Sequence, residues 1–330
     1  MSGFSLSVDW LRFTIPSMAV QTVMEQLGGD FIQASSGFLG YTIGYLQTAG
    51  NRGLIRIGTG KKGNPQEVHV DCSGGVVSGW SFEKLQALAR WTVNQRGKFG
   101  RIDNALDDRK GVVTVEQVES AVKAGQAVKR SKKWRKVEES NDELDQITGY
   151  TLYLGSRQSN TLIRIYDKAL EQRGKGVEVE GPWVRWEMEL KDARAHACGL
   201  ALAHLPEDKY RQFVVGVLRS SVDFRDTCRE DEAWMRCAAP VLSWWQELTE
   251  GFAKARLLIQ KTQKKIEDVK QWAAHSLGPM LAVLEAAPGA GREFLDVVIA
   301  AGKDRWKTRH YDLLQRIDPG RVYVLQGSSF

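Results

Sequence analysis

Two segments of the chain, residues 162–168 and 183–191, alternate apolar and charged side chains with a period of two. This period is that of a β-strand, in which successive side chains point to opposite faces of a sheet. A shorter segment repeats the design, with Arg101 and Asp103 on one face and Ile102 on the other. The sequence therefore predicts an antiparallel sheet with one apolar and one charged face. The charged face of the two longer strands carries Arg164, Tyr166, Lys168, Arg185, Glu187, Glu189 and Lys191.

The rest of the first two hundred residues indicates further strands and two inserted helices. One helix is predicted over 81–94, and a second begins at Thr114 with a capping box that ends at Gln117. The strand signals are β-branched or aromatic residues bounded by Gly or Pro, and they lie in segments 4–15, 37–46, 53–60, 67–72 and 150–155.

Beyond Leu205 the apolar residues recur at helical spacing, for example over residues 252–272, and no internal repeat is visible in the chain. A chain of 330 residues exceeds what one hydrophobic core usually supports, so two domains are expected. We therefore predict an α+β fold. Residues 1–204 form an antiparallel β-sheet domain with flanking helices, and residues 205–330 form a helical C-terminal domain.

The composition is typical of a soluble globular protein, with 42% hydrophobic and 26% charged residues. No run of 18 apolar residues occurs, and the N-terminus lacks the basic and apolar segments of a secretory signal, so no membrane association is expected. The four cysteines form no Cys-x-x-Cys pair, which favours reduced thiols and a cytoplasmic location. They are Cys72, Cys198, Cys228 and Cys237.

The net charge of +6 is compatible with a nucleic-acid partner but does not establish one. Residues 129–136 hold six basic residues, among them Lys132, Lys133 and Arg135, and the acidic stretch 138–145 follows. Two interpretations stay open for this segment: an arm that contacts DNA, or a solvated loop whose charges compensate one another.

If the charged strand faces lie on one surface, they bring together a phenol, several carboxylates and several cations. Carboxylates hold a hard divalent cation, cations stabilise charge on a phosphate, and a tyrosine oxygen can trap a phosphoryl group covalently. This combination suits phosphoryl transfer. The competing interpretation is that the charges mark an ordinary solvent-exposed sheet face. No Gly-x-x-x-x-Gly-Lys-Ser/Thr segment occurs, which excludes a P-loop ATPase.

Four segments in register make the chain similar to a known family: Arg101–Asp108 (RIDNALDD), Thr151–Ser159 (TLYLGSRQS), Arg164–Lys168 (RIYDK) and Arg185–Lys191 (RWEMELK). The chain resembles the replication initiation factor family of rolling-circle plasmids, filamentous phages and integrative elements. The resemblance implies a relaxase-like sheet domain. It also implies a site-specific endonuclease that nicks one strand of origin DNA, joins the 5′ phosphate to a tyrosine, and primes rolling-circle replication from the free 3′ hydroxyl.

Carried over by residue, the resemblance implies that Tyr166 is the nucleophile, with Arg164 and Lys168 beside the phosphate. Tyr150 and Tyr153 are competing nucleophiles that lack the flanking cations. The implied metal ligands are Asp103 and Glu187, with Glu189 in reserve, and the implied DNA contacts are Ser156, Arg157, Arg185, Lys132, Lys133 and Arg135. Because no His-x-His pair occurs, a carboxylate-rich site favours Mg²⁺ or Mn²⁺ over zinc.

Two alternatives remain at this stage. The chain could be a sequence-specific DNA-binding regulator on the same scaffold without chemistry, although paired carboxylates near DNA argue against a pure binder. The same nick could also serve conjugative transfer in place of replication. The expected partner is origin DNA, single-stranded or as supercoiled duplex, and the sequence leaves open a host helicase and a homodimer.

Overall fold

The computed structural model describes residues 4–48, 53–129, 131–141, 146–257, 266–287 and 292–303, and residues 305, 306, 310 and 314. The chain divides into two compact units, Met1–Ile259 and Gln260–Phe330. None of the described helices is both long enough and apolar enough to span a membrane.

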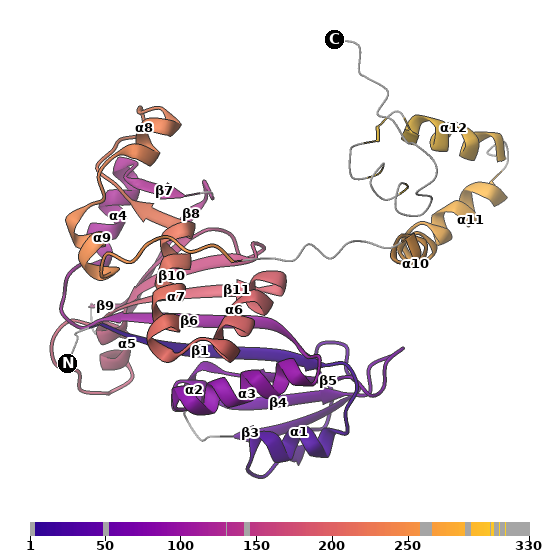
Figure 1. Cartoon of the computed structure of the whole chain (residues 1–330), viewed down its shortest axis with the longest axis horizontal. Helices are drawn as coiled ribbons and strands as arrows, with labels where there is room; N and C mark the ends of the chain where they lie inside the picture. Colours follow the sequence, from indigo (N-terminus) through magenta and orange to yellow (C-terminus); the bar gives the residue numbers. More distant parts are fainter. Residues whose placement is uncertain are drawn as a thin grey trace. The chain divides into compact units, whose positions relative to one another are not determined.

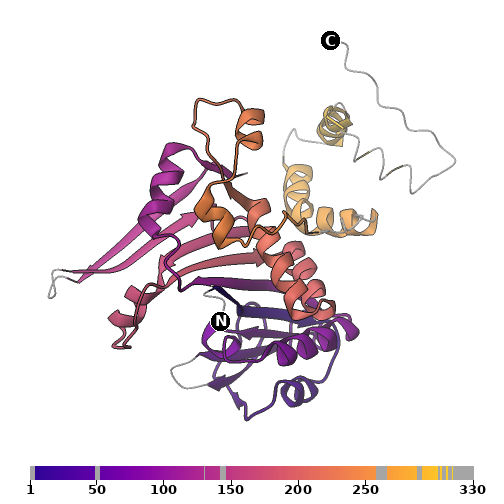
Figure 2. The same ribbon diagram turned by 60° about the vertical axis from the view of Figure 1, so that its left-hand side comes forward.

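The first unit is built on a ten-stranded antiparallel sheet (Figures 1 and 2). Its strands are β1 (Phe4–Ile15), β2 (Ile32–Gln33), β3 (Ile43–Thr48), β4 (Leu54–Thr59), β5 (Val68–Cys72), β6 (Lys98–Asp108), β8 (Trp134–Asn141), β9 (Gln146–Leu154), β10 (Thr161–Asp167) and β11 (Val184–Lys191). A separate two-stranded sheet pairs β7 (Ala127–Lys129) with β12 (Val222–Phe224).

The helices of this unit are α1 (Val20–Leu27), α2 (Gly74–Val77), α3 (Phe82–Asn94), α4 (Val115–Ala124), α5 (Lys168–Gly174), α6 (Asp192–His204), α7 (Glu207–Ser221), α8 (Ala233–Ala238) and α9 (Ser243–Leu248). In Figure 1, α2, α3, α6 and α7 lie in front of the strands. Their apolar stripes join one core with the inward side chains of the sheet, among them Leu11, Ile102 and Leu190, none of which has exposed surface.

The strand order reveals a repeat that the sequence does not display. From the central antiparallel pair β1–β6, one half of the sheet runs outward through β5, β4, β3 and β2, and the other through β11, β10, β9 and β8. Each half consists of a first strand, a helix, a meander that returns beside the first strand, and a closing helix. The closing helices, α3 and α6, pack against each other.

The predicted α+β class and antiparallel sheet are confirmed, and the capping box at Thr114 is present. Two local predictions differ. The charged segment, for which an arm and a solvated loop were both open, forms β8 at the sheet edge from Trp134. Residues 252–257, expected to begin a helix, are not helical, and residues 258–265 of that predicted helix lie outside the described residues.

The predicted domain boundary at 204/205 falls inside the first unit. Helix α7 follows α6 after a short turn, and Trp245 of α9 packs on Trp186 of β11 with ring centroids 5.2 Å apart. The segment up to residue 259 therefore belongs with the sheet. The second unit holds α10 (Ile266–Ser276), α11 (Gly278–Ala286) and α12 (Arg292–Lys303).

Candidate active site

The sheet face opposite the helices carries the charged side chains that the alternation predicts. Strand register places Arg164 of β10 opposite Glu187 of β11, and Tyr166 opposite Arg185. Across the next pair of strands, Glu189 lies opposite Asp103 of β6. Pairing between strands thus brings segments far apart in sequence onto one charged surface.

Tyr166 is the most enclosed polar group of β10 on this face, with 9% of its surface exposed. Its hydroxyl donates a hydrogen bond to Oε1 of Glu187 at 2.5 Å. Burial raises the pKa of the Tyr166 hydroxyl well above its usual range, and the charge of Glu187 raises it further. The phenol is therefore protonated at neutral pH, and Glu187 is in place to accept its proton.

Two cations flank the ring of Tyr166. The guanidinium of Arg164 and the ammonium of Lys168 each lie 5.5 Å from the ring centre. Lys168 reaches this position because α5 begins directly after β10: the Asp167 carboxylate caps the helix by accepting a hydrogen bond from the Leu170 N–H at 2.8 Å. Arg164 also pairs with Glu187. The R-I-Y-D-K segment thus places a phenol between two positive charges.

An open cavity of about 200 Å³ adjoins Tyr166 and shares Glu187 with it. Of the residues implied by the resemblance, the cavity brings together the three carboxylates, Arg164 and Arg157. Its full lining is Asp103, Tyr153, Arg157, Leu162, Arg164, Glu187, Glu189 and Lys191.

The three carboxylates of this cavity are held by arginines. Arg101 lies 2.5 Å from Asp103 and 2.9 Å from Glu189, and Arg164 pairs with Glu187. Across the part of the chain that the structure describes, no three His, Cys, Asp or Glu side chains are grouped as a metal site. The donor chemistry nevertheless fits a hard divalent ion. Burial raises the pKa of Asp103 to about 6, although the hydrogen bond and charge of Arg101 lower it. The charges of Glu189 and Glu187 add to the rise. A cation among these three carboxylates would therefore be stabilised.

Sequence reasoning missed two carboxylates of this face, Asp9 and Asp107. Asp107 accepts hydrogen bonds from Nε and Nη2 of Arg185 at 2.7 and 2.8 Å. Asp9 lies 3.2 Å from Nη1 of the same guanidinium. Burial raises the pKa of Asp9, and the charge of Glu187 adds to the rise.

Asp9 reaches the charged face through an irregularity in β1, where the register with β6 shifts between Val8 and Trp10. The sequence carries a signal of this bulge. Buried apolar residues occupy even positions before it, such as Phe4 and Val8, and odd positions after it, such as Leu11. Such a change of parity within one strand indicates an extra residue.

The competing tyrosines lie on opposite faces of β9. Tyr150 is buried on the helix side, where its hydroxyl donates to Glu119 of α4. Tyr153 lines the cavity beside Arg164, and the guanidinium of Arg135 lies 4.7 Å from its ring centre. Tyr153 is therefore the alternative nucleophile that has access to the same cavity as the three carboxylates.

A family model described as replication initiation factor (Rep_trans) matches residues 97–299 of the chain. The chain belongs to the replication initiation factor family. The resemblance inferred from the four sequence segments is confirmed. The matched region begins one residue before β6, so it covers the half of the sheet that holds Tyr166.

Two individual proteins match a larger part of the chain than the family model does. NicK of Bacillus subtilis (strain 168), a candidate DNA relaxase by its name, is 26% identical over 311 residues, which cover 89% of this chain and 84% of NicK. The structure of a rolling circle replication initiator protein from Geobacillus stearothermophilus covers 78% of this chain and 100% of its own, with a TM-score of 0.63 and 24% identity. The second likeness establishes a shared fold.

The residues predicted to contact DNA differ in how exposed they are and in what they bind. Arg157 is exposed at the cavity, and its carbonyl oxygen accepts a hydrogen bond from Lys191 at 2.8 Å. Ser156 is half-buried in the same turn. Arg185 is buried and donates hydrogen bonds to Asp107 and Asp9, and its predicted contact with DNA stays a prediction.

The basic arm lies at and beside the sheet edge. Lys132 and Lys133 are exposed just before β8, and Arg135 is exposed on β8 itself. Arg135 stands over Tyr153 on the charged face. The roles of these residues in DNA binding stay predictions.

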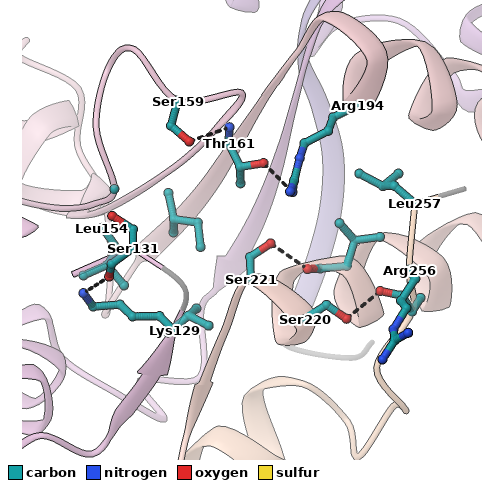
Figure 3. Close-up of a pocket in the computed structure, with 15 residues that line it drawn as sticks. Lys129, Ser131, Leu154, Ser159, Thr161, Arg194, Ser220, Ser221, Arg256 and Leu257 are labelled. Atoms are coloured by element: carbon teal, nitrogen blue, oxygen red, sulfur yellow. Dashed lines mark hydrogen bonds between the residues drawn. The ribbon is translucent and has the colours of Figure 1, made fainter. Parts of the chain in front are cut away.

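A second cavity, of about 230 Å³, lies on the helix side of the sheet (Figure 3). Its floor includes Leu154 and Ile163, whose strand neighbours Tyr153 and Arg164 point to the opposite face. Two of its cations bond to neighbouring residues, as Figure 3 shows: Arg194 donates to Thr161 at 2.9 Å, and Lys129 donates to the carbonyl of Ser131. This cavity is therefore separated from the Tyr166 site by the sheet itself.

Proposed function

We propose that this chain nicks one strand of origin DNA, becomes covalently joined to it through Tyr166, and so starts rolling-circle replication of a mobile element. The observation that carries the proposal is the hydrogen bond from the Tyr166 hydroxyl to Glu187, with Arg164 and Lys168 on either side. A nucleophile, a proton acceptor and phosphate-binding cations are thereby gathered in one site.

In the proposed step, the oxygen of Tyr166 attacks the phosphorus of the scissile phosphate and passes its proton to Glu187. The bond from phosphorus to the tyrosine oxygen forms while the bond from phosphorus to the 3′ oxygen breaks. The leaving 3′ oxygen takes up a proton and becomes the hydroxyl from which synthesis is primed. The reverse exchange rejoins a 3′ hydroxyl to the 5′ phosphate and closes the strand.

The charge that develops on the phosphate is balanced by the cations beside Tyr166, namely Arg164 and Lys168. Asp103, Glu187 and Glu189 are the residues that would hold Mg²⁺ or Mn²⁺, and such an ion would add charge stabilisation at the phosphate. Arg101 bridges Asp103 and Glu189, so it would have to release these carboxylates before they could hold an ion.

The named relatives support DNA as the substrate and partner. The Geobacillus protein is a rolling circle replication initiator, which agrees with a role in replication. NicK, named as a candidate relaxase, supports a second use of the same reaction, the nicking of an element for conjugative transfer. Chemistry at Tyr166 would be the same in both cases.

The decisive test is a nicking assay on supercoiled plasmid that carries the element's own origin, with Mg²⁺ or Mn²⁺ and with EDTA. We expect wild type to relax the plasmid and form a protein–DNA adduct, and EDTA to suppress both. Tyr166→Phe should abolish the adduct, a loss of at least about a thousandfold, because it removes the attacking oxygen.

The matched control is Tyr153→Phe, which removes a hydroxyl from the cavity that adjoins Tyr166 and should leave adduct formation within a few-fold of wild type. If Tyr166→Phe still forms an adduct and Tyr153→Phe does not, the nucleophile is Tyr153. If wild type binds origin DNA but never cleaves it with either ion, the chain is a non-catalytic regulator.

A further inference from the structure

The first half of the sheet carries a second charged cluster, centred on Asp71. Oδ2 of Asp71 accepts hydrogen bonds from Arg12 and Arg56, both at 2.9 Å, and Oδ1 accepts one from Trp10 at 2.6 Å. The carboxylate has no exposed surface, whereas the side chains of Arg12 and Arg56 are 26% and 37% exposed. One buried carboxylate thus fixes two guanidinium groups at the surface.

The repeat within the sheet explains where this cluster lies. When the sequences of β5 and β11 are aligned from their first residues, Val68 and Val184, Asp71 corresponds to Glu187. Arg56 is the partner of Asp71 in β4, just as Arg164 is the partner of Glu187 in β10. The arginine–carboxylate pair of the candidate active site therefore has a counterpart in the first half, on the same face of the sheet.

The counterpart lacks the strand tyrosine. By the same register, the position of Tyr166 is taken by Gly58. The ring of Tyr41 packs over this glycine, because a Cβ at Gly58 would lie 2.9 to 3.1 Å from it. Tyr41 is itself buried and donates its hydroxyl hydrogen to Glu67 at 2.5 Å. This half of the sheet thus keeps cations and loses the nucleophile, which suits binding without cleavage.

The charges of the cluster favour an anion. Burial opposes ionisation of Asp71, but the hydrogen bond and charge of Arg12 lower its pKa, so the carboxylate stays ionised. Two guanidinium groups and one carboxylate leave one positive charge. Each guanidinium has five N–H donors and gives one to Asp71. A phosphate offers several acceptor oxygens to such a pair.

The cluster is continuous with the candidate active site. Trp10, which binds Asp71, lies under the guanidinium of Arg101 at 4.3 Å from the ring centre. Arg101 in turn pairs with Asp103 in the cavity beside Tyr166. A chain of direct contacts therefore runs from Arg56 to the catalytic face along one side of the sheet.

We propose that Arg12 and Arg56 bind a backbone phosphate of the same DNA that Tyr166 attacks, so that the first half of the sheet holds the DNA while the second half cuts it. This inference rests on the proposed function. Arg12 of β1 and Arg56 of β4 meet at Asp71 of β5, and four strand spacings separate β5 from β10, which is about 19 Å at about 4.8 Å each. The phosphate contacted by Arg12 and Arg56 is thus about six base pairs of duplex from the nick.

The test compares two fluorescent DNA probes by anisotropy over a range of salt concentrations. The short probe ends about three nucleotides from the nick on both sides, and the long probe continues for about ten base pairs. The variants are Arg56→Gln and the triple change Arg12→Gln, Asp71→Asn, Arg56→Gln. The triple variant removes one net positive charge and leaves no buried carboxylate unpaired.

We expect both variants to weaken binding of the long probe about tenfold relative to the short probe. The slope of log affinity against log salt should fall by about one for the long probe, since one phosphate contact is lost. The control, Lys84→Gln, removes the same charge from the exposed surface of α3 on the helix side and should change neither quantity.

Unchanged affinity and salt slope of Arg56→Gln on the long probe would overturn the inference, and so would equal losses on both probes. Arg56→Gln decides the matter even if the triple variant does not fold, because Asp71 keeps its bonds to Arg12 and Trp10. If wild type forms no adduct but long-probe binding still depends on Arg56, the proposed nicking function fails and the binding site stands.

Discussion

Asp103 shows most clearly how single residues of the site are tuned. Its folded pKa of about 6 exceeds the value of about 3.9 for an exposed Asp, because burial disfavours the ionised form. The protonated carboxyl therefore contributes favourably to the free energy of unfolding below about pH 4, and this contribution is lost as the pH rises through about 6. Ionised Asp103 lowers the stability of the fold at neutral pH.

We expect the free energy of unfolding of wild type, measured relative to Asp103→Asn, to fall by up to about 3 kcal/mol between about pH 4 and pH 7. Urea unfolding of both proteins at a series of pH values measures this difference. Glu250→Gln, a partly exposed carboxylate in the same unit, is the control. A difference between wild type and Asp103→Asn that stays constant with pH would contradict the assignment.

Residue positions on the charged face could be predicted where strand alternation is regular. The pattern of two strands was enough to place Arg164, Tyr166 and Glu187 on one face. Pairing with carboxylates from distant strands was not predictable, and this is why Arg185 was assigned to DNA while the structure places it between Asp107 and Asp9. Contacts of this kind depend on strand order, which alternation does not encode.

At the scale of elements, prediction followed the local signals. The capping box of α4 was read from sequence because its two hydrogen bonds join residues three apart, Thr114 and Gln117. Strand β8 was missed because it lies at the sheet edge, where charged side chains such as Arg135 and Glu138 are solvated on most sides and discourage pairing with other chains. Its charge pattern therefore looks like that of a loop.

Thr114→Ala should lower the free energy of unfolding by about 1 kcal/mol, because the Gln117 N–H loses its acceptor and the reciprocal bond is freed. Chemical denaturation with a far-ultraviolet signal measures the loss. Thr114→Ser, which keeps the hydroxyl, should stay within about 0.5 kcal/mol of wild type. Equal losses in the two variants would show that packing of the threonine methyl matters more than the cap.

At the scale of the whole molecule, the two halves of the sheet share one connectivity although no repeat is visible in the sequence. Many different apolar residues can fill the same buried position, so two halves with the same fold need not have similar sequences. The predicted boundary at 204/205 also fell inside a compact unit, since the helices beyond it complete the core, with Trp245 fully buried.

A truncated chain that ends at Ile259 should therefore fold and act on its own. We expect a single cooperative thermal transition and adduct formation on a single-stranded origin oligonucleotide within a few-fold of the full chain. A chain that ends at His204 should fail to unfold cooperatively, because it lacks the indole of Trp245 that packs on Trp186. Calorimetry and gel detection of the adduct distinguish these results. If the chain that ends at Ile259 forms no adduct, the reaction requires residues beyond 259.

The extra residue in β1 lets the side chains on both sides of it point to the correct face of the sheet. Deleting Asp9 would bring Val8 directly before Trp10, so that one end of the strand would have to turn over. Either Phe4 and Val8 would enter water or Trp10 would leave Asp71. Members of the family are therefore expected to tolerate substitutions at this position far better than a one-residue gap. An alignment of family members should therefore show varied side chains at this position but no gaps within the strand.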